Sequence, residues 1–130
     1  MLTCSLLLVA WAASCSVASS YNKRISPPVV DDEIILNYSL TIEFLQRAFY
    51  RDGLSSFQQA HFVSAGFQDP FYDNLQEIYS DEQAHVDFLN NTLHAAGFST
   101  TVELEYSFPY NNVESFVTLA SILGGVASSA

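Results

Sequence analysis

Apolar residues recur at helical spacing along residues 33–51, a stretch that contains no glycine or proline. Two adjoining apolar stripes predict a helix that is buried over a broad arc. The first stripe contains Ile35, Tyr38, Ile42, Leu45 and Phe49, and the second contains Leu36, Leu40, Phe44 and Ala48. Acidic residues at 31–33 stand where a helix N-terminus favours negative charge. Gly53 is expected to end this helix as its C-terminal cap.

The segment 54–68 is ambiguous, although its apolar spacing is compatible with a short helix that Gly66 stops. A second long helix is predicted from Asp69, as N-cap, and Pro70, in the first turn, to about Ala96. Gly97 is expected to close it. Its inward-facing seam is apolar at both ends and polar in the middle, and it contains Phe71, Leu75, Ile78, Glu82, His85, Leu89 and Leu93.

The pattern changes between Ser99 and Tyr110, where apolar and polar residues alternate until Pro109. Alternation favours an extended, perhaps strand-like crossover. A third helix is predicted to begin near Asn111 or Asn112 as its cap and to meet Gly124-Gly125 near the end of the chain. The predicted fold is therefore all-α: a helical bundle of about three helices, with an extended crossover before the third.

Composition narrows the class of protein. With 130 residues, the chain forms one domain rather than two. Four Lys and Arg against 14 Asp and Glu give a net charge of −10, which argues against nucleic-acid binding because a phosphate backbone requires clustered cations. Hydrophobic residues make up 49% of the chain, too many for a disordered acidic chain.

The N-terminal segment resembles a secretory signal peptide. A short apolar run at 6–13 precedes the small residues Ser16-Val17-Ala18, so we expect cleavage after residue 18. The protein is therefore expected to be secreted, either free or associated with the cell wall. The alternative is an N-terminal core helix. The run is too short to cross a bilayer, and we expect no membrane span elsewhere. Cys4 and Cys15 would both leave with the signal peptide, so the mature chain would contain no disulfide.

Residues 19–30 are expected to form an extended leader before a partial domain at 31–130, since Pro27-Pro28 disfavours helix there. The dibasic pair Lys23-Arg24 is either a processing site or two solvated charges. Two sequons, at Asn37 and Asn90, are candidate glycosylation sites of a secreted protein.

The polar residues of the seam are the strongest candidates for chemistry. Glu82 and His85 lie three positions apart, on one face of the predicted second helix. Glu43 of the first helix would complete half of a carboxylate-bridged two-metal site, for which one helix supplies Glu and the next supplies Glu-x-x-His. The alternative is a polar pair satisfied by hydrogen bonds to Tyr38, Tyr50 or Tyr79. His61 and His94 are interpreted as surface or packing residues.

Several segments, in order, resemble a secreted ferritin-like family that includes fungal stress- and starvation-induced proteins and plant desiccation-related proteins. The resemblance spans about residues 31–130 and rests on Leu40–Tyr50, Phe67, Glu82–Leu89, Ala96-Gly97 and Tyr106–Pro109. It implies a four-helix bundle in which Glu43, Glu82 and His85 form the first half-site, with Fe or Mn as the metal. The second half departs from the family, because Gly124, or Leu123 in another register, stands where members tend to place Glu, and the fourth helix is missing.

Three hypotheses follow. The first is a secreted, non-catalytic protein of the stress or desiccation type with a residual metal half-site. The second is a metal-binding or iron-handling protein whose two-metal site is completed by homodimerisation, which would also cover an exposed apolar face. The third is a shortened, non-functional product.

Overall fold

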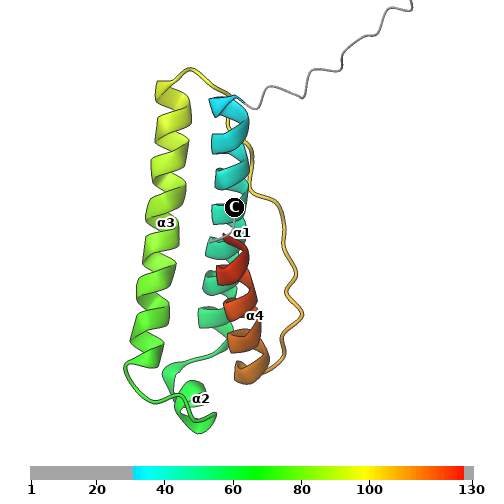
Figure 1. The fold of residues 1–130 in the computed structure, drawn as a ribbon. Helices are drawn as coiled ribbons and strands as arrows, with labels where there is room; N and C mark the ends of the chain where they lie inside the picture. Colours follow the sequence, from blue (N-terminus) through cyan, green and yellow to red (C-terminus); the bar gives the residue numbers. More distant parts are fainter. Residues whose placement is uncertain (1–30, 128–130) are drawn as a thin grey trace, which may run out of the picture.

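The computed structural model describes residues 31–127, and its helices are α1 (Asp32–Ser56), α2 (Gln59–Ser64), α3 (Phe71–Ala95) and α4 (Val113–Ala127) (Figure 1). The predicted all-α class is confirmed: three long helices and one short helix form an incomplete bundle within this part of the chain. The expected signal peptide at 1–18, the leader at 19–30 with its dibasic pair, and both cysteines lie outside the described residues.

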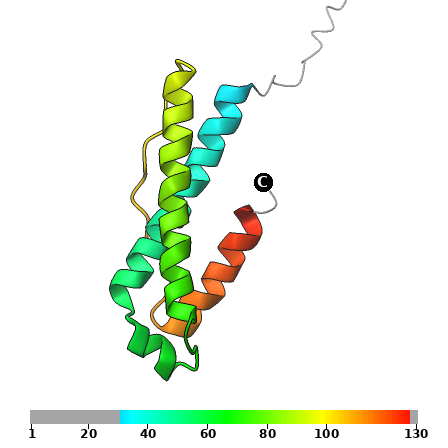
Figure 2. The same ribbon diagram turned by 90° about the vertical axis from the view of Figure 1, so that its left-hand side faces the viewer.

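α1 and α3 form an antiparallel hairpin, and the other elements lie against this hairpin (Figures 1 and 2). At the end of the hairpin near the start of α1, the core is aliphatic except for one aromatic ring, and its buried members are Leu40, Phe44, Val86 and Leu93. At the other end the core is mainly aromatic and includes residues of α2 and α4; its buried members are Phe49, Tyr50, Phe62, Leu75, Val113 and Phe116. The hairpin therefore has two cores, one at each end.

α4 contacts α1 near the C-terminal end of α1, through the first turns of α4. Towards its other end α4 leans away from α1, and it ends at about the level of the middle of α1 (Figures 1 and 2). The contact centres on Phe116, whose ring stacks on that of Phe49 with 4.7 Å between centroids. Gly53 makes this approach feasible, because a Cβ there would lie 2.7 Å from Phe116 Cζ. The prediction that Gly53 caps α1 is wrong: the helix continues to Ser56, and the glycine is needed for close packing rather than for a turn.

The turns around α2 and after α3 follow the sequence in part. Gly66 and Gly97 have φ angles of +94° and +75°, in the left-handed region expected of glycines that follow a helix. The prediction that Asp69 is the N-cap of α3 is wrong, because Pro70 occupies the cap position without a capping side chain. The Asp69 carboxylate instead accepts a hydrogen bond from Gln59 Nε2 at 2.7 Å, which ties the turn to α2.

The segment between α3 and α4 is extended, as predicted, and forms no strand in the described residues. It runs back along α1 (Figure 1). Glu103 faces inward and pairs with Arg47, and its other oxygen lies 3.6 Å from Arg51 Nη1. The alternating pattern is thus inverted here, since Val102 and Leu104 are exposed while the carboxylate faces the bundle.

Two asparagines secure the ends of this crossover. The Asn37 side chain donates from Nδ2 to the Ser99 carbonyl at 2.9 Å and accepts from the Thr101 N–H at 2.6 Å. Asn112 Oδ1 accepts from the Ser115 N–H at 2.8 Å, which confirms Asn112 as the cap of α4.

Candidate metal site

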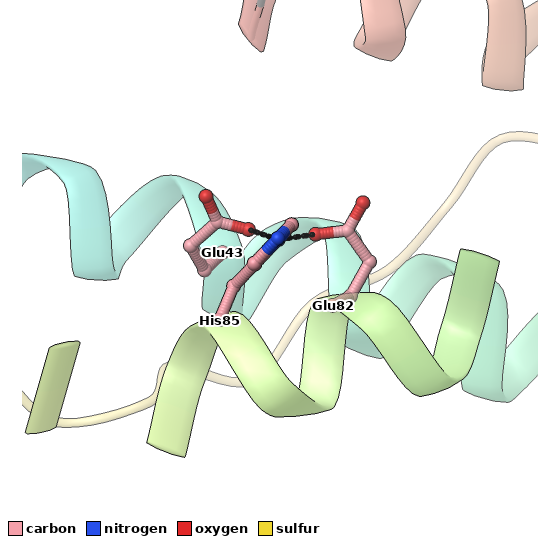
Figure 3. A group of neighbouring side chains, drawn as sticks. All are labelled: Glu43, Glu82 and His85. Atoms are coloured by element: carbon pink, nitrogen blue, oxygen red, sulfur yellow. Dashed lines mark ion pairs between the residues drawn. The ribbon is translucent and has the colours of Figure 1, made fainter. Parts of the chain in front are cut away.

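The three predicted ligands come from the middle of the α1–α3 hairpin (Figure 3). Glu43 and Glu82 each occupy the twelfth of 25 positions in their helices, so antiparallel packing places them at the same level. His85 follows Glu82 by three residues, which puts both side chains on one face of α3. The neighbouring buried residues Leu40, Phe44 and Val86 hold the two helices together at this level.

The structure brings the three side chains together. His85 Nδ1 lies 3.4 Å from Glu43 Oε2 and 3.5 Å from Glu82 Oε2, so the imidazole faces both carboxylates (Figure 3). Each residue offers one ligand atom, and these atoms all lie within 4.8 Å of one another. A single cation between them could therefore contact all three residues.

The carboxylates of this cluster are largely removed from water, which makes their charge costly. Glu82 is only 8% exposed, and Oε2 of both Glu43 and Glu82 is buried without a hydrogen-bond partner. The alternative of a pair satisfied by tyrosine hydroxyls thus fails for these two oxygens. Buried carboxylate oxygens without partners are costly, and a bound cation removes that cost by supplying both charge and coordination.

The electrostatics of Glu82 follow from the same burial. Loss of water raises its pKa from the ordinary 4.5 to about 7, with a further contribution from the neighbouring Glu43 carboxylate, while His85 acts in the opposite direction. Burial and the charge of Glu82 also raise the pKa of the Tyr50 hydroxyl. Without a cation, Glu82 in the folded chain therefore takes up its proton at a higher pH than an exposed glutamate does.

The donor set suits a divalent transition metal. Carboxylate oxygens together with an imidazole nitrogen are ligands that Mn(II), Fe(II) and Zn(II) accept, and the unpartnered buried oxygens show that these residues fit such an ion. An ion held here would have further coordination positions open. Beside the ligands lies a cavity of about 210 Å³, which Ser39, Phe88 and Leu89 also line.

The patterns in the sequence did not indicate Ser39 or Phe88 as part of the site. A signal was present, because Ser39 stands four residues before Glu43 and Phe88 three residues after His85. His61 and His94 are exposed, as interpreted from the sequence, and His61 Nδ1 accepts a hydrogen bond from the Gln58 N–H at 3.0 Å.

No second ligand set accompanies the first in the described part of the chain. The resemblance placed the second glutamate of the family at Gly124 or Leu123, on the helix that begins with the aromatic-core residue Phe116. In the structure Leu123 is half-buried and Gly124 is exposed, and neither residue has a side chain that binds a metal. The cluster of Glu43, Glu82 and His85 is the one group of three metal-ligating side chains found among the described residues.

The sequons differ in their surroundings. The amide nitrogen of Asn37 already donates to two carbonyls, those of Glu33 and Ser99, whereas Asn90 is half-buried on α3. Glycosylation at either position stays a prediction.

A two-helix hairpin with Glu on one helix and Glu-x-x-His on the other is typical of ferritin-like bundles. The family model for the ferritin-like domain matches residues 31–130, and the chain belongs to this family. No curated protein matches the chain. Among the helices that the structure describes, none is both long and apolar enough to cross a membrane.

Proposed function

We propose that the protein is a secreted ferritin-like protein that holds one divalent metal ion per chain at Glu43, Glu82 and His85. The observation that carries the proposal is a pair of buried carboxylate oxygens that accept no hydrogen bond and lie within ion-pair distance of one imidazole nitrogen. Fe(II) and Mn(II) are the favoured ions, since two carboxylates and one imidazole form a mostly oxygen donor set.

The proposed role is non-catalytic and of the stress or desiccation type. Two-metal chemistry in ferritin-like bundles uses two Glu and two Glu-x-x-His groups, and the described residues supply one of each. The bound ion would neutralise the buried carboxylates and join α1 to α3. The resemblance to secreted stress- and desiccation-related proteins supports this role, and the apolar run at 6–13 followed by small residues supports secretion.

Calorimetric titration tests metal binding. The full chain, expressed through a secretory host and purified in EDTA that is then removed, is titrated with Mn(II), with Zn(II), and with Fe(II) under anaerobic conditions. We expect one ion per chain, and His85→Ala should weaken binding by at least about tenfold because one of three protein ligands is lost.

The matched control is His94→Ala, which removes an exposed histidine from the same helix and should leave the affinity unchanged. Absence of binding in the unaltered chain, or binding that His85→Ala does not weaken, contradicts the proposal. N-terminal sequencing of the secreted protein tests the expected cleavage, and retention of residues 1–18 would contradict that part.

A further inference from the structure

The side of the hairpin on which α4 lies is left uncovered by the described residues between the metal site and the N-terminus of α1. α4 contacts α1 at Phe49 and leans away from it further along (Figure 2). Beyond that contact Ile35 is 49% and Tyr38 58% exposed on α1, and Phe88 of α3 is 66% exposed beside the metal site. Large exposed apolar residues indicate a binding surface, which we call the open face.

The metal site lies at one end of the open face. Ile35, Ser39 and Glu43 follow one another at intervals of four residues, so they lie along one side of α1. The cavity beside the ligands is lined by Ser39, His85 and Phe88. A segment that lies along this face from the start of α1 therefore reaches the carboxylates of the site.

We propose that the open face binds residues 19–30 of the same chain, with Lys23 and Arg24 at the carboxylates of Glu43 and Glu82, and that this contact regulates metal binding; the inference rests on the proposed function. An extended segment is narrow enough to lie beside α4. A symmetric second copy would instead bring its own α4 into the same layer.

The start of α1 directs the preceding residues towards this face. Asp31 is the N-cap of α1, and its side chain accepts a hydrogen bond from the Ile34 N–H at 3.0 Å. An apolar residue immediately before an N-cap often packs against the fourth residue of the helix, which fixes the angle at which the chain enters. Val30 and Ile35 occupy these two positions, so the segment offers the exposed Ile35 an apolar partner.

The length of the segment matches the distance to the site. Eleven residues separate Asp32 from Glu43, which corresponds to about 16 Å of helix. Pro27-Pro28 favours an extended backbone, in which the seven residues 24–30 span about 22 Å. The basic pair therefore reaches the level of Glu43, with about two residues left for the turn at the start of α1.

The charge of the segment complements that of the site. Arg47 and Arg51 pair with Glu103 on the crossover. The other two of the four Lys and Arg in the chain are Lys23 and Arg24, and both belong to this segment. The unpartnered buried oxygens of the site can accept charge-assisted hydrogen bonds from these cations. Because such a cation opposes a metal ion at the same carboxylates, the segment weakens metal binding, and proteolysis after Arg24 would release the site.

Zero-length crosslinking tests whether the segment docks. The chain is secreted from a host that lacks dibasic proteases, its mass confirms that residues 19–30 are present, and a carbodiimide is added in EDTA. We expect an amide between Lys23 and Glu43 within one chain, which excess Mn(II) should suppress. Absence of this amide in EDTA overturns the inference. A dimer in light scattering whose crosslinks join two chains also overturns it, because a second copy would then occupy the face.

Titration with Mn(II) tests the effect on the site. Lys23→Gln combined with Arg24→Gln removes both charges and should bind Mn(II) at least about threefold more tightly than the unaltered chain. The matched control, Lys23→Arg combined with Arg24→Lys, keeps both charges and should bind like the unaltered chain. Equal affinities of the glutamine variant and the unaltered chain overturn the regulation and leave the proposed function intact. If none of these chains binds Mn(II), the proposed function and the regulation both fail, and the crosslink decides the docking separately.

A pair of substitutions tests the assigned face. Ile35→Gln removes the apolar contact at the start of α1 with a residue that favours helix. We expect it to lower the yield of the Lys23–Glu43 amide at least about threefold. The control is Val102→Gln, at a 73% exposed position on the crossover, which should leave the yield unchanged. Equal yields from the two variants overturn the assigned face.

Discussion

Replacing Glu82 with glutamine should stabilise the metal-free protein, although it removes a proposed ligand. In the folded chain, burial and Glu43 raise the pKa of Glu82 from 4.5 to about 7. A carboxyl with a raised folded-state pKa stabilises the fold fully below its unfolded pKa, and this contribution is lost as the pH rises through the folded value. The metal-free protein should therefore lose stability between about pH 4.5 and pH 7.

The size of the effect follows from the pKa shift. Each unit corresponds to about 1.4 kcal/mol, so ionising Glu82 at pH 8 costs the fold about 3 kcal/mol at most. Glu82→Gln is neutral at every pH, and its amide can donate to the unpartnered Oε2 of Glu43. We expect a gain of roughly 2 kcal/mol at pH 8, which corresponds to an increase in Tm of about 10 °C for a domain of this size.

Urea unfolding in EDTA at pH 5 and pH 8 provides the measurement. The control is Glu77→Gln, which makes the same chemical change at an exposed position of α3 and should alter stability little. In Mn(II) the order should reverse, because only the unaltered chain gains the binding energy of the ion. A Glu82→Gln protein that is less stable than the unaltered chain at pH 8 in EDTA, or that keeps its pH dependence, would refute the reasoning.

Three further substitutions test the packing. Gly53→Ala should destabilise the fold by about 1–3 kcal/mol in urea unfolding, because its Cβ collides with the Phe116 ring. Gly124→Ala, at an open position in α4, is its control and should be neutral or stabilising; equal effects would contradict the packing argument. Asn37→Ala should cost about 1–3 kcal/mol and speed proteolysis within the crossover, since its hydrogen bonds to that segment are lost; unchanged cleavage would contradict this. Glu103→Gln should cost about 1 kcal/mol and raise hydrogen exchange there, because the half-buried pairing with two arginines is lost; protection equal to that of the unaltered chain would count against it.

The long helices could be predicted from the sequence because their apolar spacing is regular. The start of α1 and both ends of α3 are close to those predicted, whereas α1 continues to Ser56, beyond the predicted cap at Gly53. The errors concern residues whose role depends on distant partners. Glycine is the residue type expected at a helix C-cap, but Gly53 lies inside α1, where the ring of Phe116, far along the chain, packs directly against its backbone. Aspartate is a residue type expected at a helix N-cap, but the Asp69 carboxylate accepts a hydrogen bond from the Gln59 side chain instead.

The crossover shows the same limit. Alternation correctly predicted an extended backbone, yet which face turns inward depends on Arg47 and Arg51, which pair with Glu103. Periodicity within one segment contains no information about an ion pair with another segment. The proximity of the three proposed ligands was predictable, because two lie on one helix face and the third lies on the apolar face of its neighbour. The extent of their burial was not, because it depends on how closely α1 and α3 pack at this level.

The layer of Glu43, Glu82 and His85 interrupts the apolar interior between the two cores of the hairpin. The aromatic end is larger and is tied to α2 and α4, whereas the other end depends on four buried side chains. The smaller end can therefore open locally at a lower free energy than the whole domain unfolds. Amide protons of the first half of α1 and the last half of α3 should exchange first, and an ion at the polar layer would make the two ends open together.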